Sequence, residues 1–241
     1  MKKRIDLLLV ERNLSETRTK AQALVMSGQV LVEGEIVDKP GMSVKEDSII
    51  DIKEKYPYVS RGASKLEKAY VSFGINFKNK TICDIGSSTG GFTDFALQHG
   101  AKKIYAIDVG RGQLDQKIRE DSRVVSMEKT DFRNIQKLDR KIDYFLCDVS
   151  FISLRKILPK IKDLVEYKTE VIALIKPQFE AGAKEVTRGK GVIKSEQVRL
   201  ETVTEIKIFA QDIGFQVEGV VESPIRGAKG NVEYLIYLKL V

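Results

Sequence analysis

The 241-residue chain has no tryptophan, a single histidine and only two cysteines. The only histidine, His99, precedes Gly100 at a predicted helix end, so we expect neither a histidine-based catalytic triad nor a zinc site with several histidines. Cys83 and Cys147 both lie in apolar, strand-like runs, which predicts buried, reduced thiols rather than a disulfide or a metal site. Any catalysis must therefore use other groups, and we expect no metal.

Long apolar stretches are missing as well. No run approaches the roughly 20 residues that a membrane-spanning helix needs. An acid, Asp6, stands where the apolar core of a signal peptide would lie. The sequence therefore predicts a cytoplasmic protein that does not enter a membrane.

The composition is that of a globular protein with an excess of positive charge. Hydrophobic residues make up 42% of the chain, enough for a real core, and the length favours two domains. The 41 lysines and arginines outnumber the 34 acidic residues and leave a net charge of +7. Such an excess favours a polyanionic partner, nucleic acid or an anionic membrane surface, with a merely solvated basic surface as the alternative.

The first 59 residues form a separate small pattern. A helix is predicted from Ile5 to about Asn13, and a second helix, capped by Ser15, ends at Gly28. Short strands are predicted at 29–33, 35–37 and 48–52. Tyr56-Pro57-Tyr58 indicates a linker over residues 56–60, between domains 1–55 and 61–241.

The motif Ser15-x-x-Arg18-x-x-Ala21-x-x-Leu24-Val25-x-x-Gly28, followed by Val30-x-Val32-x-Gly34, resembles the S4 RNA-binding module. Residues 1–30 carry six basic and three acidic side chains, which predicts one basic face. The resemblance implies that this face contacts RNA phosphates, although each cation taken alone could be a solvated helix charge. The expected contacts are Lys3, Arg4, Arg12, Arg18 and Lys20.

Residues 80–241 alternate apolar strands with helix-length segments. Strands are predicted at 81–84, 103–108, 124–126, 144–148 and 171–175, followed by an antiparallel pair at 215–221 and 232–240. This alternation predicts an α/β fold, a mostly parallel, doubly wound Rossmann-like sheet closed by two antiparallel strands.

A glycine-rich turn, Asp84-Ile-Gly86-Ser-Ser-Thr-Gly90-Gly91-Phe92, follows the first of these strands. Glycines let the backbone turn tightly and approach a ligand at the edge where such sheets bind cofactors. Ser88 replaces the second glycine of the dinucleotide fingerprint, and the turn instead resembles motif I of class I S-adenosylmethionine-dependent methyltransferases.

Two acids continue this pattern. Asp108 ends the next strand and is placed to accept both ribose hydroxyls, and Asp131 could accept from the adenine amino group. The alternative is that the three acids of the pattern are capping or surface residues. The complete set expected at the cofactor is Asp84, Gly86, Ser87, Ser88, Thr89, Gly90, Gly91, Phe92, Asp108, Val109, Asp131, Phe132 and Asp148.

Five motifs follow one another in the chain: Arg-Gly-x-x-Lys-Leu, the glycine-rich turn, Asp-Val-Ser-Phe-Ile-Ser-Leu, Lys-Pro-Gln-Phe-Glu and Gly-Asn-x-Glu-Tyr. In this order they resemble the haemolysin-A-like, or TlyA, family of ribosomal RNA 2′-O-methyltransferases, in which an S4 module precedes an FtsJ-like catalytic domain. The resemblance implies S-adenosylmethionine as cofactor, and a cytidine of ribosomal RNA or of a ribosomal subunit as substrate. It also implies a catalytic tetrad of Lys65, Asp148, Lys176 and Glu233. We expect a monomer.

The chemistry agrees with this tetrad, because a ribose hydroxyl is a weak nucleophile whose proton must be removed or delocalised. Lys176 is the expected base or hydroxyl-polarising group, oriented by Asp148 and Glu233. Lys65 would supply the nearby cation that a lysine base needs. Three alternatives remain open: two structural salt bridges, a non-enzymatic RNA-binding or ribosome-assembly factor, and a membrane-active haemolysin.

Further residues have two interpretations each. Residues 187–191 are predicted to form a mobile, glycine-rich loop. Its cations and those of neighbouring motifs could contact RNA phosphates or be solvated: Arg61, Arg188, Lys190, Arg226 and Lys229. Phe151 and Phe179 could stack on a flipped base, but core packing is the favoured interpretation.

Overall fold

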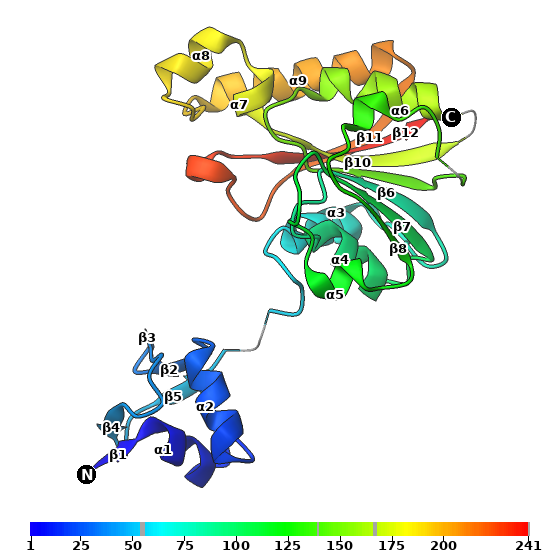
Figure 1. The fold of residues 1–241 in the computed structure, drawn as a ribbon. Helices are drawn as coiled ribbons and strands as arrows, with labels where there is room; N and C mark the ends of the chain where they lie inside the picture. The colour runs from blue at the N-terminus through cyan, green and yellow to red at the C-terminus, as the bar shows by residue number, and fades with distance from the viewer. Residues whose placement is uncertain (54–55, 139, 166–167, 241) are drawn as a thin grey trace. The chain divides into compact units, whose positions relative to one another are not determined.

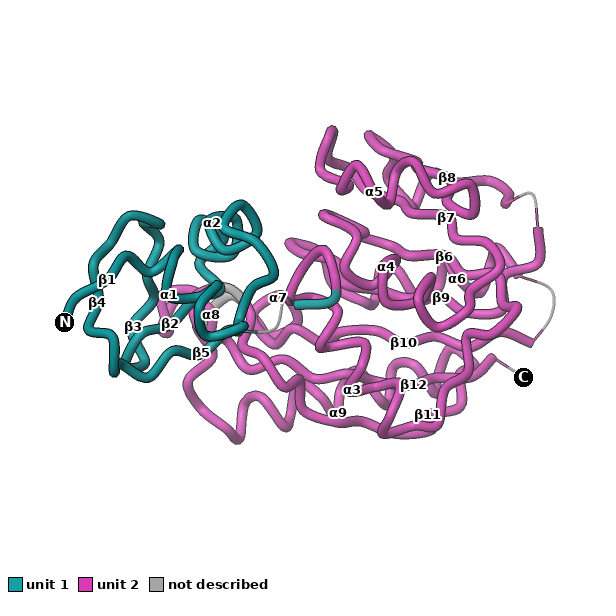
Figure 2. The backbone as a smooth tube through the Cα atoms, turned by 90° about the horizontal axis from the view of Figure 1, so that it is seen from below, with its two compact units in different colours: residues 1–57 teal, residues 58–241 magenta. Residues whose placement is uncertain are grey.

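The structure, a computed structural model, describes residues 1–53, 56–138, 140–165 and 168–240. The chain divides into two compact units, unit 1 (Met1–Pro57) and unit 2 (Tyr58–Val241), coloured separately in Figure 2. The expected ends of the two domains, residues 55 and 241, lie outside the described residues. Within the expected linker, Tyr58 packs on Phe95 and the Val59 amide donates to Asp94, both inside unit 2.

Unit 1 joins two short helices to small antiparallel sheets. The elements are β1 Lys2–Arg4, α1 Ile5–Glu11, α2 Arg18–Met26, β2 Val30–Val32, β3 Glu35–Ile36, β4 Ser43–Lys45 and β5 Ile50–Ile52. β2 lies between β3 and β5, and β1 pairs with β4. The buried side chains of Leu9, Ala21 and Val25 form the core between the helices.

Two details of unit 1 differ from the prediction. Thr17, and not Ser15, caps α2, because its side chain accepts a 3.2 Å hydrogen bond from the Lys20 amide. Ser15 instead donates to the Thr17 carbonyl. The strands β1 and β4 were also not predicted, since neither three-residue segment has an apolar pattern.

Unit 2 contains a seven-stranded sheet in the order β11-β12-β10-β9-β6-β7-β8 (Figure 1). The strands are β6 Thr81–Ile85, β7 Lys103–Ile107, β8 Val124–Met127, β9 Tyr144–Cys147, β10 Thr169–Ile175, β11 Phe215–Glu222 and β12 Tyr234–Leu240. β6 to β10 are parallel to their neighbours in this set, whereas β12 runs antiparallel to both β10 and β11. The predicted sheet, including its antiparallel C-terminal pair, is confirmed.

Helices cover both faces of this sheet, as Figure 1 shows. They are α3 Ala63–Phe73, α4 Gly91–Gln98, α5 Gln116–Arg119, α6 Leu158–Leu164, α7 Pro177–Glu180, α8 Ala183–Arg188 and α9 Glu196–Asp212, with short 3-10 turns η1 Phe132–Asn134, η2 Leu154–Lys156 and η3 Ala228–Gly230. Residues from α3, α4 and α5 pack on one face of the sheet, and residues from α6 and α9 pack on the other.

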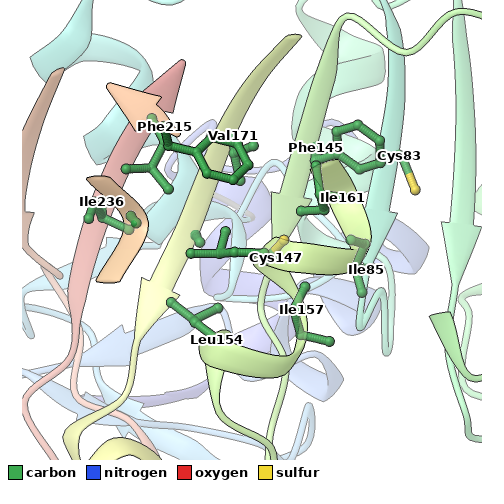
Figure 3. Packing of buried hydrophobic residues seen from close by; sticks show 14 of the residues in the cluster. Cys83, Ile85, Phe145, Cys147, Leu154, Ile157, Ile161, Val171, Phe215 and Ile236 are labelled. Atoms are coloured by element: carbon green, nitrogen blue, oxygen red, sulfur yellow. The ribbon is translucent and has the colours of Figure 1, made fainter. Parts of the chain in front are cut away.

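Successive residues along a central strand pack on opposite faces of the sheet, in two separate apolar clusters. Ile82 and Leu146 pack with α3 and α4, whereas Cys83 and Cys147 pack on the opposite face. Figure 3 shows the two cysteines among the apolar side chains of that face. A strand buried on both faces explains the continuous apolar runs in the sequence. Both cysteines are free and buried, as predicted.

Two absences hold for the part of the chain that the structure describes. No helix there is long and apolar enough to cross a membrane. The described residues also include no group of three or more histidine, cysteine or acidic side chains that could hold a metal ion.

Candidate active site

Four elements bring the expected tetrad together at one edge of the sheet. Asp148 and Lys176 follow the parallel strands β9 and β10, whose carboxyl ends meet at this edge. Glu233 precedes β12, which starts at the same edge because it runs antiparallel to β10. Lys65 reaches the site from α3. All four side chains line a pocket of about 360 Å³.

The tetrad is a continuous chain of charged contacts. Lys176 Nζ lies 2.6 Å from Asp148 Oδ1, and Lys65 Nζ lies 3.4 Å from Asp148 Oδ2. Lys65 Nζ also lies 2.8 Å from Glu233 Oε2. Asp148 is therefore shared by the two lysines, and the chain runs from Lys176 through Asp148 and Lys65 to Glu233.

The contacts within this chain favour the charged forms of Lys65 and Asp148. Lys65, Lys176 and Glu233 are buried. Burial disfavours the charge of Lys65, but Asp148 and Glu233 outweigh that penalty and raise its pKa. Burial also opposes the charge of Asp148, and the ammonium groups of Lys176 and Lys65 outweigh it and lower the pKa of that carboxyl.

Two residues that the sequence analysis did not single out complete the pocket. Ser150 Oγ accepts a 2.9 Å hydrogen bond from Lys176, and Gln178 Nε2 donates one of 3.2 Å to Glu233. Both line the pocket, and the Gln178 Oε1 atom has no hydrogen-bond partner. The sequence could have indicated both residues, because they lie inside the motifs Asp-Val-Ser and Lys-Pro-Gln, which follow strands.

The glycine-rich turn lies at the same pocket, which Ser87, Ser88, Thr89 and Phe92 line. Gly86 has a φ of +81°, and a Cβ atom there would lie 2.8 Å from the backbone oxygen of Asp148. Only glycine allows this close approach of the two strand ends. Gly90 and Gly91 follow, and α4 begins at Gly91.

Asp84 is fully buried before this turn. Its Oδ2 accepts a 2.6 Å hydrogen bond from Thr93, and its Oδ1 has no partner. Burial, only partly offset by Thr93, raises the pKa of Asp84 to about 7.

The other expected cofactor residues follow the neighbouring strands β7 and β8. The Asp108 carboxylate accepts hydrogen bonds from the Ser88 amide (2.8 Å) and the Gly110 amide (2.7 Å), which orient both of its oxygens. Val109 is 71% exposed, whereas Phe132 is buried. The Asp131 carboxylate is paired with the guanidinium of its own neighbour, Arg133, and caps η1.

The expected core packing of Phe151 is wrong. Its side chain is 92% exposed and not packed in the core, and it lines the pocket next to Ser150. The φ of +63° at Phe151 turns the residue away from the path of an ordinary strand or helix, and its ring contacts that of Phe179 at 5.1 Å. An aromatic pair, with Phe151 exposed and Phe179 half-buried, therefore borders the pocket.

The expected RNA-contacting cations of unit 1 also have partners inside that unit. Buried Asp6 accepts from Arg4 (2.9 Å), Arg18 (3.1 Å) and Gln22 (3.0 Å). Arg12 donates to the carbonyls of Ser48 and Glu46, while Lys3 pairs with Glu11 and Lys20 with Glu16. Arg4 and Arg18 still expose 44% and 53% of their side chains, so Asp6 orients two accessible guanidinium groups.

Asp6→Asn is expected to destabilise unit 1 by about 1–2 kcal/mol at neutral pH, because charge-assisted hydrogen bonds are lost. The hydrogen bond from Arg4 holds the pKa of Asp6 well below its usual range; burial opposes this, and Gln22 and Arg18 reinforce it. A carboxyl with a lowered pKa stabilises the fold above its unfolded pKa of about 3.9 and loses that contribution as the pH falls further.

The stability difference between wild type and Asp6→Asn should therefore shrink as the pH falls below about 4. This stability difference can be measured by hydrogen exchange of residues 1–57 in the full chain, corrected for the intrinsic exchange rate. A difference that stays constant through that pH range would contradict the assigned role of Asp6.

The remaining expected RNA contacts are exposed in unit 2. Arg61 precedes α3, and Arg226 lies 3.7 Å from Glu222. Arg188 ends α8, so the predicted mobile loop at 187–191 is wrong for its first two residues, which are helical. Lys190 follows α8. Lys229 lies beside Gly191, so the segment after α8 meets the segment around η3. The buried Asn231 joins them, since it bonds Gly191 and Ile193.

The fold and the pocket define a class I methyltransferase. A family model described as FtsJ-like methyltransferase matches residues 58–240, and the S4 domain model matches residues 3–50. The chain therefore belongs to the FtsJ-like methyltransferase family, whose methyl donor is S-adenosylmethionine. Two solved structures, one from Listeria monocytogenes provisionally named an S-adenosylmethionine-dependent methyltransferase and one methyltransferase of that class from Aquifex aeolicus, are 18% identical and share the fold over 75% and 76% of this chain.

Within this family the chain belongs with the TlyA proteins. YqxC of Bacillus subtilis, provisionally named an rRNA methyltransferase, is 45% identical over 98% of this chain and 85% of its own length. The 16S/23S rRNA (cytidine-2′-O)-methyltransferase TlyA of Mycobacterium tuberculosis is 37% identical over 98% of this chain and 89% of its own. A solved structure from Streptococcus thermophilus, provisionally named a hemolysin, is 42% identical, covers 100% of this chain and 89% of its own, and has a TM-score of 0.76.

Proposed function

We propose that this protein methylates the 2′-oxygen of a cytidine ribose in ribosomal RNA. Lys65, Asp148, Lys176 and Glu233 are its catalytic group. The observation that carries the proposal is the unbroken chain of contacts among these side chains, at 2.6, 3.4 and 2.8 Å, in one pocket. The cytidine is proposed from the names of two relatives, rRNA (cytidine-2′-O)-methyltransferases that are 37% and 35% identical to this chain.

The tetrad is suited to activating a hydroxyl group. In the proposal, Lys176 takes the proton of the 2′-hydroxyl or polarises that group. Asp148 orients Lys176 through the 2.6 Å contact, and Glu233 holds Lys65, which adds positive charge beside the developing alkoxide. Buried charges act strongly here, because water is largely excluded from them.

The cofactor supplies the methyl group, carried on a positively charged sulfur. Its site is supported by the close approach at Gly86, by the turn lining the pocket, and by the amides that orient Asp108. The residues proposed to hold it are Asp84, Gly86, Ser87, Ser88, Thr89, Gly90, Gly91, Phe92, Asp108, Val109, Asp131, Phe132 and Asp148. Within that set Asp131 is the residue least available to accept from a ligand, because Arg133 already donates to both of its carboxylate oxygens.

The RNA is proposed to contact both units. Residues 1–55 would form the RNA-binding domain through Lys3, Arg4, Arg12, Arg18 and Lys20, followed by a linker at 56–60 and the catalytic domain at 61–241. Arg61, Arg188, Lys190, Arg226 and Lys229 would contact phosphates near the pocket. The exposed Phe151 ring offers a surface on which an unstacked base can lie. The enzyme would act as a monomer in the cytoplasm, where ribosomes lie.

Incubation with labelled S-adenosylmethionine tests this proposal. The wild-type protein should transfer label to 30S subunits, 50S subunits or protein-free ribosomal RNA, and nuclease mapping should place the methyl group on a cytidine 2′-oxygen. Label on a base, or no label in any of the three substrates, would refute the proposed reaction. Titration of the cofactor by calorimetry separates an enzyme from an RNA-binding factor with an empty site.

A further inference from the structure

We propose that Ser150 is the proton exit of the active site: its hydroxyl passes the proton released by methyl transfer from Lys176 to solvent. This inference rests on the proposed function. Transfer of a methyl group to a hydroxyl releases one proton in every turnover, and the proton must leave the pocket before the next. Lys176, the group proposed to receive it, is buried and paired with Asp148, so it needs a neighbour that can accept a proton.

The charged neighbours of Lys176 are poor proton acceptors. Asp148 bridges two lysines, which stabilise its ionised form. Glu233 is buried and engaged by Lys65 and Gln178. Lys65 is itself an ammonium held between two carboxylates. None of these three groups connects Lys176 to solvent through a neutral donor and acceptor.

Ser150 has the properties that the route requires. Its Oγ accepts a 2.9 Å hydrogen bond from Lys176 Nζ, and its residue is exposed to solvent. A hydroxyl both accepts and donates, so it can receive one proton while it releases another. The bond also occupies one of the three N–H groups of Lys176, and Asp148 occupies a second, which leaves the third to face a substrate hydroxyl.

The proposed sequence balances. Before methyl transfer, the Lys176 ammonium gives one proton to Ser150 Oγ as Ser150 releases its own proton to water, which leaves Lys176 a neutral amine. Rotation about the Cε–Nζ bond then turns the lone pair of the amine toward the 2′-hydroxyl, and the amine takes the proton of that hydroxyl. The oxygen's electron pair forms the bond to the methyl carbon, and the pair of the broken carbon–sulfur bond stays on sulfur. Lys176 is again an ammonium, and one proton has reached solvent.

Single-turnover methylation of ribosomal RNA by Ser150→Ala and Ser150→Thr tests the route. Ser150→Ala should lower the rate about 10- to 100-fold, while the affinities for RNA and S-adenosylmethionine stay within about twofold of wild type. Ser150→Thr keeps the hydroxyl and should recover most of the rate. An equal melting temperature of Ser150→Ala and wild type shows that the fold is retained.

Proton inventories in mixtures of H₂O and D₂O separate transfer from mere orientation of Lys176. The wild-type rate should depend on the deuterium fraction along a curve that indicates more than one moving proton, and the curvature should be lost in Ser150→Ala. A wild-type rate in Ser150→Ala, or an unchanged inventory in a slower Ser150→Ala, would overturn the proposal. Failure of the proposed function itself would differ, because the wild-type protein would then not label RNA.

Discussion

Lys176→Met is expected to lower the single-turnover rate of methyl transfer at least about a thousandfold, the range typical of lost proton transfer and charge stabilisation together. Methionine has a similar length but neither charge nor a nitrogen that can hold a proton. Asp148 keeps Lys65 as a partner at 3.4 Å, so the carboxylate is not left without a cation. The loss should therefore appear in the rate and not in the fold.

A second replacement separates the two proposed roles of Lys176. Arginine keeps the positive charge but does not give up a proton in proteins. If Lys176 takes the proton of the hydroxyl, Lys176→Arg should be nearly as inactive as Lys176→Met; substantial activity would instead favour polarisation alone. Lys68→Met, an exposed lysine of α3, is the matched control and should retain the wild-type rate. Wild-type activity in Lys176→Met would exclude a catalytic role for this residue.

Gly227→Ala is expected to lower kcat about a hundredfold although Gly227 has no side chain to take part in the reaction. A Cβ atom at Gly227 would lie 1.9 Å from Glu233 Oε1 and 2.5 Å from its Cδ, so the carboxylate must move. Glu233 would then lose its 2.8 Å contact with Lys65 and its hydrogen bond with Gln178. Displacement of a catalytic group by about 1 Å is enough for an effect of this size.

The experiment has a control and a rescue. Gly182→Ala adds the same methyl group at a position where, apart from the two chain neighbours, no atom of the described residues lies within 4 Å of it, and it should leave kcat unchanged. Glu233→Asp in the Gly227→Ala background shortens the acid by one methylene group and should recover part of the rate. Steady-state kinetics at saturating RNA measures all three proteins. Full activity of Gly227→Ala would show that the position of Glu233 is not critical.

The order of elements could be predicted because it depends on local patterns. Continuous apolar runs separated by helix-length segments predicted each strand of the seven-stranded sheet within a few residues. Local patterns were less decisive where two similar residues compete, as Ser15 and Thr17 do for the cap of α2. Both residue types cap helices well, and the backbone path decides between them.

The candidate site was predictable only in part. Its four residues came from motif resemblance, since Lys65 and Glu233 lie 168 positions apart and no local pattern connects them. Phe151 was expected in the core, with stacking on a flipped base as the alternative. A left-handed backbone conformation at Phe151 turns it outward, and such a conformation is rare for a bulky residue and carries no sequence signal of its own.

The sequence alone determined the class of sheet, the glycine turn at its edge, and the exclusion of a zinc site built on several histidines, since the chain has one histidine. These properties follow from apolar periodicity, from the special conformations of glycine and from composition. Only the tertiary structure decided that Asp148 is shared by two lysines, that Ser150 and Gln178 complete the pocket, and that Asp6 orients Arg4 and Arg18. Such pairings depend on which strand ends meet and on how closely their backbones approach, and those distances are set by packing across the whole sheet.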